Sequence, residues 1–136
     1  MPDRSIGYTK RGSEQTWVSN VNTLPYRGMA AGGGYSTAGD LLRFATALTS
    51  NRLLQAKYTA LLTATKVATP GGSYGLGFME RDFNGVRAFG HGGGAPGMNG
   101  ELLIFPSGYV VVTLANIDPP AATEVARFIA NRLPVK

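Results

Sequence analysis

The sequence predicts an α/β fold of the α+β type: two helices, then an antiparallel sheet of about four strands, then a carboxy-terminal helix packed on that sheet. Two observations carry this prediction. Apolar residues recur at i, i+3, i+4 and i+7 within residues 38–49, as on one face of a helix. From residue 74 the pattern changes to short runs of β-branched and aromatic residues separated by turn formers. The 136 residues suffice for one domain, 1–136.

Residues 1–35 are rich in Gly, Ser, Thr and Asn and show no sustained period, so we expect them to be loop-rich. They end on the run MAAGGG, residues 29–34, which is typical of a loop. A loop of this length in a compact domain is usually functional or packed against another part of the protein. We therefore expect this segment to have a role at the surface of the fold.

Residues 36–66 are predicted to be helical. Thr37 and Asp40 have the spacing of a capping box, which places the start of the first helix at Ala38. Its predicted buried face comprises Leu41, Leu42, Phe44, Ala45 and Leu48. A second helix fits residues 55–65, before Pro70-Gly71-Gly72 interrupts the pattern.

The sheet is predicted over residues 74–116 as an antiparallel meander. Its four expected strands are residues 74–80, 86–90, 101–105 and 109–115. The turn sequences DFNG, residues 82–85, and PSG, residues 106–108, join the first pair and the last pair.

The carboxy-terminal helix is predicted over residues 119–133. Asp118-Pro119-Pro120 suits a helix start, because proline is tolerated in the first turn. The apolar face expected to pack on the sheet comprises Val125, Phe128, Ile129 and Leu133.

Composition argues against several classes of protein. The net charge is +5, but the basic residues are scattered and their longest cluster is Lys10-Arg11, which does not favour a nucleic-acid partner. No apolar run approaches the roughly 18 residues of a membrane span. One histidine without any cysteine offers no metal-ligand spacing, so we expect no metal and no cofactor. The segment MPDRSIGYTKRG lacks the apolar stretch of a secretory signal, and the localisation stays open.

The most informative stretch is FGHGGGAPGMNG, residues 89–100, which holds the single histidine, His91. His-Gly-Gly-Gly also occurs in the oxyanion loop of α/β-hydrolase esterases, and residues 71–75 satisfy G-x-S-x-G. However, Ser73 follows a Pro-Gly break and leads into a strand, whereas a nucleophile elbow joins a strand to a helix. A triad would also need a histidine downstream of Ser73 besides the one in the loop. The order of the motifs therefore argues against this esterase fold.

Together with its flanking strand, hairpin and terminal helix, FGHGGG resembles the active-site edge strand of the serine β-lactamase and penicillin-binding-protein-like family. The resemblance is to the class C β-lactamase and esterase branch, in which this strand carries Lys-Thr-Gly or His-x-Gly. GGGYSTAGDLLRF, residues 32–44, resembles the family segment that leads into a helix, and both matches occur in the family's order. The resemblance extends from about Ile6 onward. It implies the carboxy-terminal portion of a partial β-lactamase-like fold, within a serine hydrolase that acts on a small-molecule acyl substrate.

The resemblance also implies roles for individual residues. His91 takes the place of the strand's Lys or His beside the nucleophile; alternatively, it is a polar residue satisfied at a strand end. Gly94 takes the place whose N–H is one of two oxyanion-hole donors, and Gly92, Gly93 and Ala95 line the substrate. Gly92 stands where family members often carry Thr or Ser, which favours an ester, amide or small peptide over a β-lactam.

The family's nucleophile motif, Ser-x-x-Lys, is absent from the sequence, because no serine has a lysine three residues later. No tyrosine has an asparagine two residues later either, so Tyr-x-Asn is also missing. Thr63-Ala64-Thr65-Lys66 is the single Thr-x-x-Lys, and its position late in a predicted helix indicates a structural role. We therefore expect the carboxy-terminal portion of a longer serine hydrolase, inactive by itself.

Two functional hypotheses follow. In the first, the chain supplies the oxyanion-hole strand and is completed by a polypeptide that carries Ser-x-x-Lys. In the second, it is a non-catalytic remnant or binding module that holds a ligand or extended peptide in its glycine-lined groove. In both hypotheses the first strands and the nucleophile helix of the family fold are missing from this chain. Their absence should leave a sheet edge and an apolar face uncovered, so we expect self-association.

Overall fold

The computed structural model describes residues 4–11, 13, 16–23, 28–70 and 72–134. Within them the helices are α1 (Ala38–Thr49), α2 (Ala56–Thr63) and α3 (Ala121–Ala130). The strands are β1 (Tyr8–Arg11), β2 (Thr16–Ser19), β3 (Val67–Thr69), β4 (Gly72–Tyr74), β5 (Met79–Phe83), β6 (Val86–Ala95), β7 (Met98–Ile104) and β8 (Val110–Ala115).

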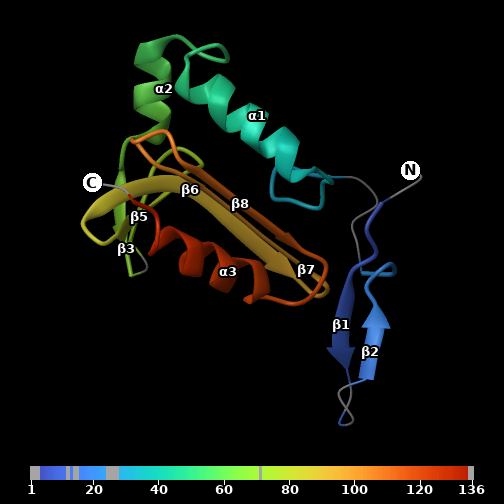
Figure 1. The fold of residues 1–136 in the computed structure, drawn as a ribbon. Coiled ribbons are helices and arrows are strands. Elements are labelled where there is room, and N and C mark those ends of the chain that lie inside the picture. Colours follow the sequence, from blue (N-terminus) through green and yellow to red (C-terminus); the bar gives the residue numbers. More distant parts are fainter. Residues whose placement is uncertain (1–3, 12, 14–15, 24–27, 71, 135–136) are drawn as a thin grey trace.

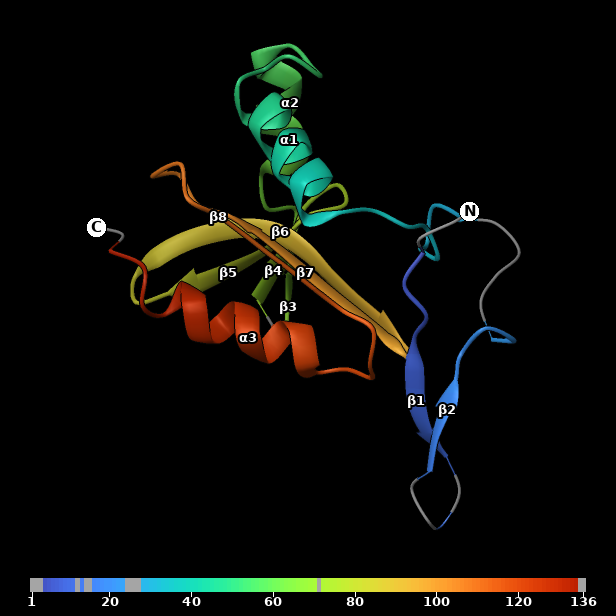
Figure 2. The same cartoon turned by 45° about the vertical axis from the view of Figure 1, so that its right-hand side comes forward.

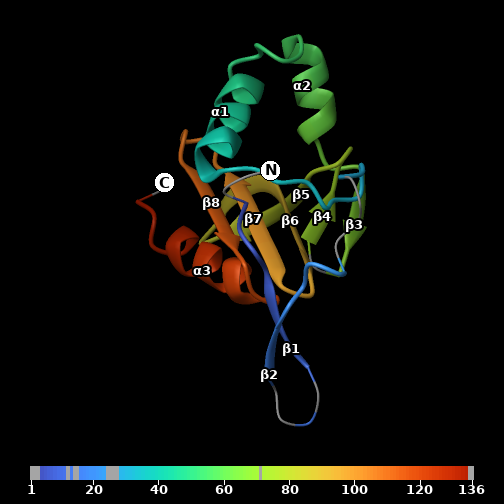
Figure 3. The same cartoon turned by 90° about the vertical axis from the view of Figure 1, so that its right-hand side faces the viewer.

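The strands β3 to β8 form one sheet in which each strand is antiparallel to the next, so the predicted meander is confirmed. The helix α3 lies along one face of this sheet, and α1 and α2 lie on the opposite side (Figures 1 and 2). The hairpin β1–β2 lies beyond the end of β6 and β7 (Figures 1 and 2) and extends below the sheet in the view of Figure 3. The α+β class is as the sequence predicts.

The number of strands differs from the prediction, because the sheet has six strands within the described residues and not four. The expected strand at 74–80 is wrong: Tyr74 ends β4 and Met79 begins β5. Between them the Gly75 N–H donates to the Phe78 carbonyl at 2.7 Å, and Gly77 has φ +90°, so the chain turns here. The apolar run that suggested one strand therefore contains a tight turn.

The strand that carries the histidine is also longer than expected. The sequence predicts strands over residues 86–90 and 101–105, but β6 extends to Ala95 and β7 begins at Met98. Only Pro96 and Gly97 form the turn, and Gly97 has φ +74°. Proline followed by a left-handed glycine is the chemistry of a type II turn. This two-residue hairpin carries the ladder to the end of the glycine-rich stretch.

Two short strands, which the sequence pattern does not predict, lie within the segment 1–35 that was expected to be loop-rich. The strands β1 and β2 pair in register from Tyr8↔Ser19 to Arg11↔Thr16. These strands are mostly exposed and lack a buried alternating face, which is why periodicity does not predict them. The hairpin is fastened to the rest of the fold by Asp118, whose Oδ2 accepts from the Thr9 hydroxyl at 3.0 Å and from the Lys10 N–H at 3.2 Å.

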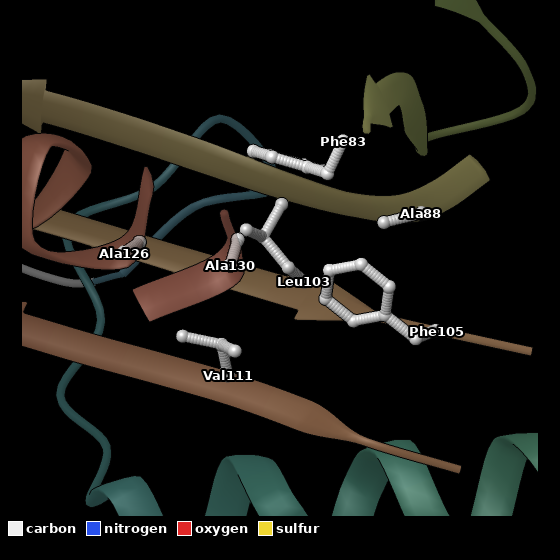
Figure 4. Packing of buried hydrophobic residues seen from close by; sticks show 7 residues of the cluster. All are labelled: Phe83, Ala88, Leu103, Phe105, Val111, Ala126 and Ala130. Atoms are coloured by element: carbon white, nitrogen blue, oxygen red, sulfur yellow. The ribbon is translucent and has the colours of Figure 1, made fainter. Parts of the chain in front are cut away.

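The main core lies between α3 and the sheet, as Figure 4 shows. Its members are Phe83, Ala88, Leu103, Phe105, Val111, Ala126 and Ala130. A smaller cluster on the opposite face joins α1 to the sheet and contains Ala45, Leu102 and Ile104. The sheet is thus covered on both faces, with the better filled layer under α3.

The predicted packing faces of two helices need correction. In α1 the capping box forms as expected, with the Asp40 N–H donating to Thr37 Oγ1, but only Ala45 and Leu48 are buried. Leu42 and Phe44 are exposed, because α1 is covered only on its side toward the sheet.

The predicted buried face of α3 is wrong. Its buried residues are Ala122, Ala126 and Ala130, whereas Val125 is 51% exposed and Phe128 is 59% exposed. The alanine stripe allows a close approach to the sheet, where large side chains from the strands fill the space. Ile129 is also exposed, and Leu133 packs against the edge of the core.

Candidate functional site

The site is built on a part of β6 that has a neighbouring strand on one side only. The ladder between β5 and β6 ends at Met79↔Gly90, while β6 stays paired with β7 from Phe89↔Ile104 to Ala95↔Met98. Among the residues that the structure describes, no strand pairs with the other side of residues 91–95. This stretch is therefore an open backbone edge within the sheet.

The register determines which backbone groups face that open side. Successive residues of an antiparallel strand direct their N–H and C=O to opposite neighbours. The two-residue turn closes on Ala95↔Met98, which is the hydrogen-bonded pair of such a turn. Alternate residues back from Ala95 therefore face β7, and the N–H and C=O of Gly92 and Gly94 face the open side.

His91 is exposed and lies beside an aromatic residue that the sequence did not single out. Its Nε2 is 3.0 Å from the Tyr74 hydroxyl, and the two rings meet edge to face with centroids 5.9 Å apart. Either group can donate in this hydrogen bond, depending on the tautomer of the imidazole. Tyr74 belongs to β4, two strands away from β6, so no local sequence signal links it to His91.

The three glycines that follow His91 have different surroundings. A Cβ at Gly92 would overlap the carboxylate of Glu101, a cross-strand neighbour that is 3% exposed. A Cβ at Gly94 would overlap the ring of Pro119. A Cβ at Gly93 would meet nothing within 4 Å. The protein's own packing therefore excludes side chains at two of these positions, and only Gly93 opens onto free space.

Glu101 is held by an ion pair. Its Oε1 lies 2.6 Å from Arg81 Nη1, and the Arg81 side chain is itself mostly buried. A buried carboxylate must be paired, because desolvation without a partner is costly. Gly92 makes room for this pair, which accounts for the absence of the Thr or Ser side chain expected from the family resemblance.

A groove of about 670 Å³ lies next to the open strand. Its lining includes residues 31–36, 93–95, 97–100 and 114–116. Among the described residues, every side chain that lines it is uncharged. Of the predicted site residues, the groove brings together Gly93, Gly94 and Ala95, whereas His91 and Gly92 lie outside its lining.

The turn at the end of the site is fastened from two directions. The Asn20 side-chain amide donates to the Pro96 carbonyl at 3.0 Å, and the Gly97 N–H donates to Asp118 Oδ1 at 2.7 Å. The hydrogen bond from Gly97, followed by that from Thr9 and then that from Lys10, holds the pKa of Asp118 below its usual range. These contacts fix the position of the hairpin relative to the groove.

The described residues contain no cluster of three potential metal ligands. None of their helices has the length and apolar character needed to cross a bilayer. The hydroxyl of Thr63, in the single Thr-x-x-Lys, donates to the Thr59 carbonyl at 3.0 Å, a hydrogen bond internal to α2.

The chain is similar to known proteins in sequence and in structure. The profile of the family described as Beta-lactamase matches residues 1–135. The penicillin-binding protein from Bacillus halodurans is similar in structure, with a TM-score of 0.83 and 28% identity over 96% of this chain and 41% of that one. The D-stereospecific amidohydrolase from a Streptomyces species has a TM-score of 0.78 and 27% identity over 100% of this chain and 41% of that one.

No curated protein matches the sequence. The chain spans 41% of the length of each of the two solved structures. The profile match covers nearly all of the sequence, and both structural neighbours share the arrangement of sheet and helices. The chain belongs to the beta-lactamase family of serine hydrolases.

Proposed function

We propose that this chain supplies the oxyanion-hole strand of a β-lactamase-like serine hydrolase, and that a polypeptide carrying Ser-x-x-Lys completes the active site. The observation that carries the proposal is the position of Gly94, which lines the groove and whose N–H faces the open side of β6 by register. A backbone N–H aimed at the developing oxyanion stabilises an acyl-transfer transition state by about 3 to 4 kcal/mol. The rest of β6 would position this donor.

His91 is the polar side chain at the start of the open stretch. In the proposed site it lies beside the nucleophile, where its imidazole donates or accepts a hydrogen bond during proton transfer. The hydrogen bond between the Tyr74 hydroxyl and Nε2 supports this role, because it restrains the ring and occupies only one of its two nitrogens. Nδ1 then remains for the reacting groups.

The groove favours an uncharged acyl substrate. Among the described residues no charged side chain lines it, and Gly92 lacks the hydroxyl that, by the family resemblance, would help to recognise a substrate carboxylate. An ester or amide therefore suits the site better than a β-lactam, which carries a carboxylate. Gly93 and Ala95 would border the acyl group, because both line the groove.

The open edge of β6 also favours a second candidate function, a binding module without catalysis. An extended peptide can add to a free sheet edge through main-chain hydrogen bonds. The backbone groups of Gly92 and Gly94 have the alternate spacing that such a strand needs. The two functions differ in whether a nucleophile is supplied.

Hydrolysis of p-nitrophenyl butyrate and nitrocefin tests the proposal, using the purified chain alone and mixed with a family polypeptide that carries Ser-x-x-Lys. We expect turnover only in the mixture and faster turnover of the ester. Gly94→Pro removes the N–H donor, and Gly94→Ala is the matched control, because both add a Cβ against Pro119 but only proline deletes the donor. We expect Gly94→Pro to be about 100-fold to 1,000-fold slower than Gly94→Ala.

Equal rates for the two variants would overturn the oxyanion assignment. Turnover by the chain alone that disappears in Gly94→Pro would place a nucleophile within these residues and overturn the need for a second polypeptide. A mixture that is inactive, with a wild-type chain that binds an extended peptide at β6, would favour the binding module.

A further inference from the structure

We propose that Asn99 is a positioning residue that orients the peptide between Gly93 and Gly94, and thereby the N–H that would stabilise the oxyanion. The consequence for catalysis rests on the proposed function, but the orientation itself does not. Asn99 lies in β7 directly opposite Gly94 and is 7% exposed.

The Asn99 side chain makes hydrogen bonds in two directions. Its Nδ2 donates to the Gly93 carbonyl at 2.8 Å and lies 3.5 Å from the Thr123 hydroxyl. Its Oδ1 accepts from the Ala122 N–H at 2.8 Å and from the Thr123 N–H at 3.1 Å. One buried amide therefore connects β6 to the first turn of α3.

The Gly93 carbonyl and the Gly94 N–H belong to the same planar peptide unit. In a trans peptide these two groups point in opposite directions, so fixing the carbonyl fixes the direction of the N–H. A hydrogen bond to the carbonyl also polarises the peptide and strengthens its N–H as a donor. Asn99 thus acts on Gly94 through the bond that it makes to Gly93.

This peptide needs such a support. Residues 92–94 are all glycine, which has the greatest backbone freedom, and β6 has no neighbouring strand on its open side among the described residues. A Cβ at Gly93 would meet nothing, so packing does not hold this residue in place. The ladder to β7 and the Asn99 amide are what restrain it.

The helix α3 in turn holds Asn99. The N-cap residue of α3 is Pro120, whose side chain makes no capping hydrogen bond. Oδ1 of Asn99 satisfies two N–H groups of the first turn instead, which leaves Nδ2 aimed at β6. A helix terminus therefore fixes the orientation of the amide, and the amide fixes the orientation of the peptide.

A purely structural role, in which Asn99 only caps α3, makes a different prediction. Asn99→Asp keeps an oxygen for the Ala122 and Thr123 N–H groups but removes the donor to Gly93. Asn99→Ala removes both interactions. The two variants therefore separate the cap from the support of the glycine peptide.

The test is nuclear magnetic resonance of the labelled full chain. In Asn99→Asp we expect the Ala122 and Thr123 amides to stay protected from exchange. The order parameter of the Gly94 N–H should fall from about 0.85, typical of a rigid backbone, to below about 0.6. The Gly93 carbonyl resonance should shift in the same variant. In Asn99→Ala the protection of Ala122 and Thr123 should be lost as well.

An unchanged Gly94 order parameter and Gly93 resonance in a folded Asn99→Asp protein would overturn the inference. If that variant does not fold, the wild-type protein still decides: a scalar coupling across the hydrogen bond from Asn99 Nδ2 to the Gly93 carbonyl is expected, and its absence contradicts the proposal. None of these measurements needs catalysis. Failure of the oxyanion assignment, seen as equal rates for Gly94→Pro and Gly94→Ala, is thus distinguishable from failure of this inference.

Discussion

The carboxylate of Glu101 occupies the space that a side chain at Gly92 would need, because a Cβ built on Gly92 would lie 2.8 Å from Oε1 and closer still to Oε2. The two residues face each other across β6 and β7. Glu101 cannot move away freely, since it is buried and paired with Arg81 at 2.6 Å. The glycine and the buried ion pair are therefore a single structural unit.

This relationship predicts that Gly92→Thr destabilises the fold. The added side chain would displace the Glu101 carboxylate from Arg81, and we expect a loss of about 1 to 3 kcal/mol in the free energy of unfolding, as for overpacking in a core. Urea denaturation measures it. Gly93→Ala is the matched control, because its Cβ would meet nothing, and it should change stability by about 0.5 kcal/mol or less. A stable Gly92→Thr protein would mean that the ion pair rearranges easily.

Asp118 predicts a dependence of stability on pH. The hydrogen bonds from Gly97, Thr9 and Lys10 lower its pKa in the folded protein below the ordinary value of 3.8. A carboxyl with a lower pKa when folded stabilises the protein above its unfolded pKa, and this contribution is lost as the pH falls through the folded pKa. Unfolding by urea at pH 7 and at several values below 4 should therefore show decreasing stability.

Asp118→Asn should be less stable at pH 7 and should lose less stability on acidification. Asp40 also has a lowered pKa, because Thr37 and Arg43 donate hydrogen bonds to it and Arg43 is positively charged. Asp40→Asn is therefore the control, since it removes a different carboxyl whose pKa is lowered. A pH profile of Asp118→Asn that is parallel to the wild-type profile would show that Asp118 is not a source of the effect.

The packing of α3 predicts which substitutions in this helix destabilise the fold most. Periodicity assigns Phe128 to the core, where truncation to alanine would cost about 3 to 5 kcal/mol. Because the structure places this ring 59% exposed and stacked on Arg132, we expect Phe128→Ala to cost about 1 kcal/mol or less. Ala126→Leu should cost about 1 to 3 kcal/mol, because Ala126 is fully buried against the sheet. The reverse order in thermal or urea unfolding would contradict the docking of α3 through its alanines.

The same exposed face predicts self-association. Val125, Phe128 and Ile129 form an exposed apolar strip on α3, and exposed apolar patches favour contacts between copies. We expect light scattering to show a dimer or larger species that dissociates on dilution. Phe128→Asp should shift the population toward monomer, whereas Arg127→Ala, a neighbouring polar control, should not. A monodisperse wild-type monomer over the whole concentration range would contradict this expectation.

Local sequence patterns determined one helix and two of the hairpin connections of this fold. The capping box and apolar period of residues 37–49 predicted α1 with its observed bounds, and the turn sequences 82–85 and 106–108 predicted two hairpin connections of the meander. These features depend on residues close together in the chain, where propensity and turn chemistry act directly. The passages around residues 32–44 and 89–94 likewise indicated the family that the profile match shows.

The tertiary structure alone decided which groups meet at the site and which face of a helix is buried. The pairs Tyr74 with His91 and Gly92 with Glu101, and the contact of Asn99 with both Gly93 and α3, join residues from different elements through the strand register. The helix α3 has two faces of nonpolar residues, alanines on one and larger side chains on the other, and periodicity cannot choose between them. The choice follows from the space left by the sheet, because close packing against its large side chains admits only the smaller face.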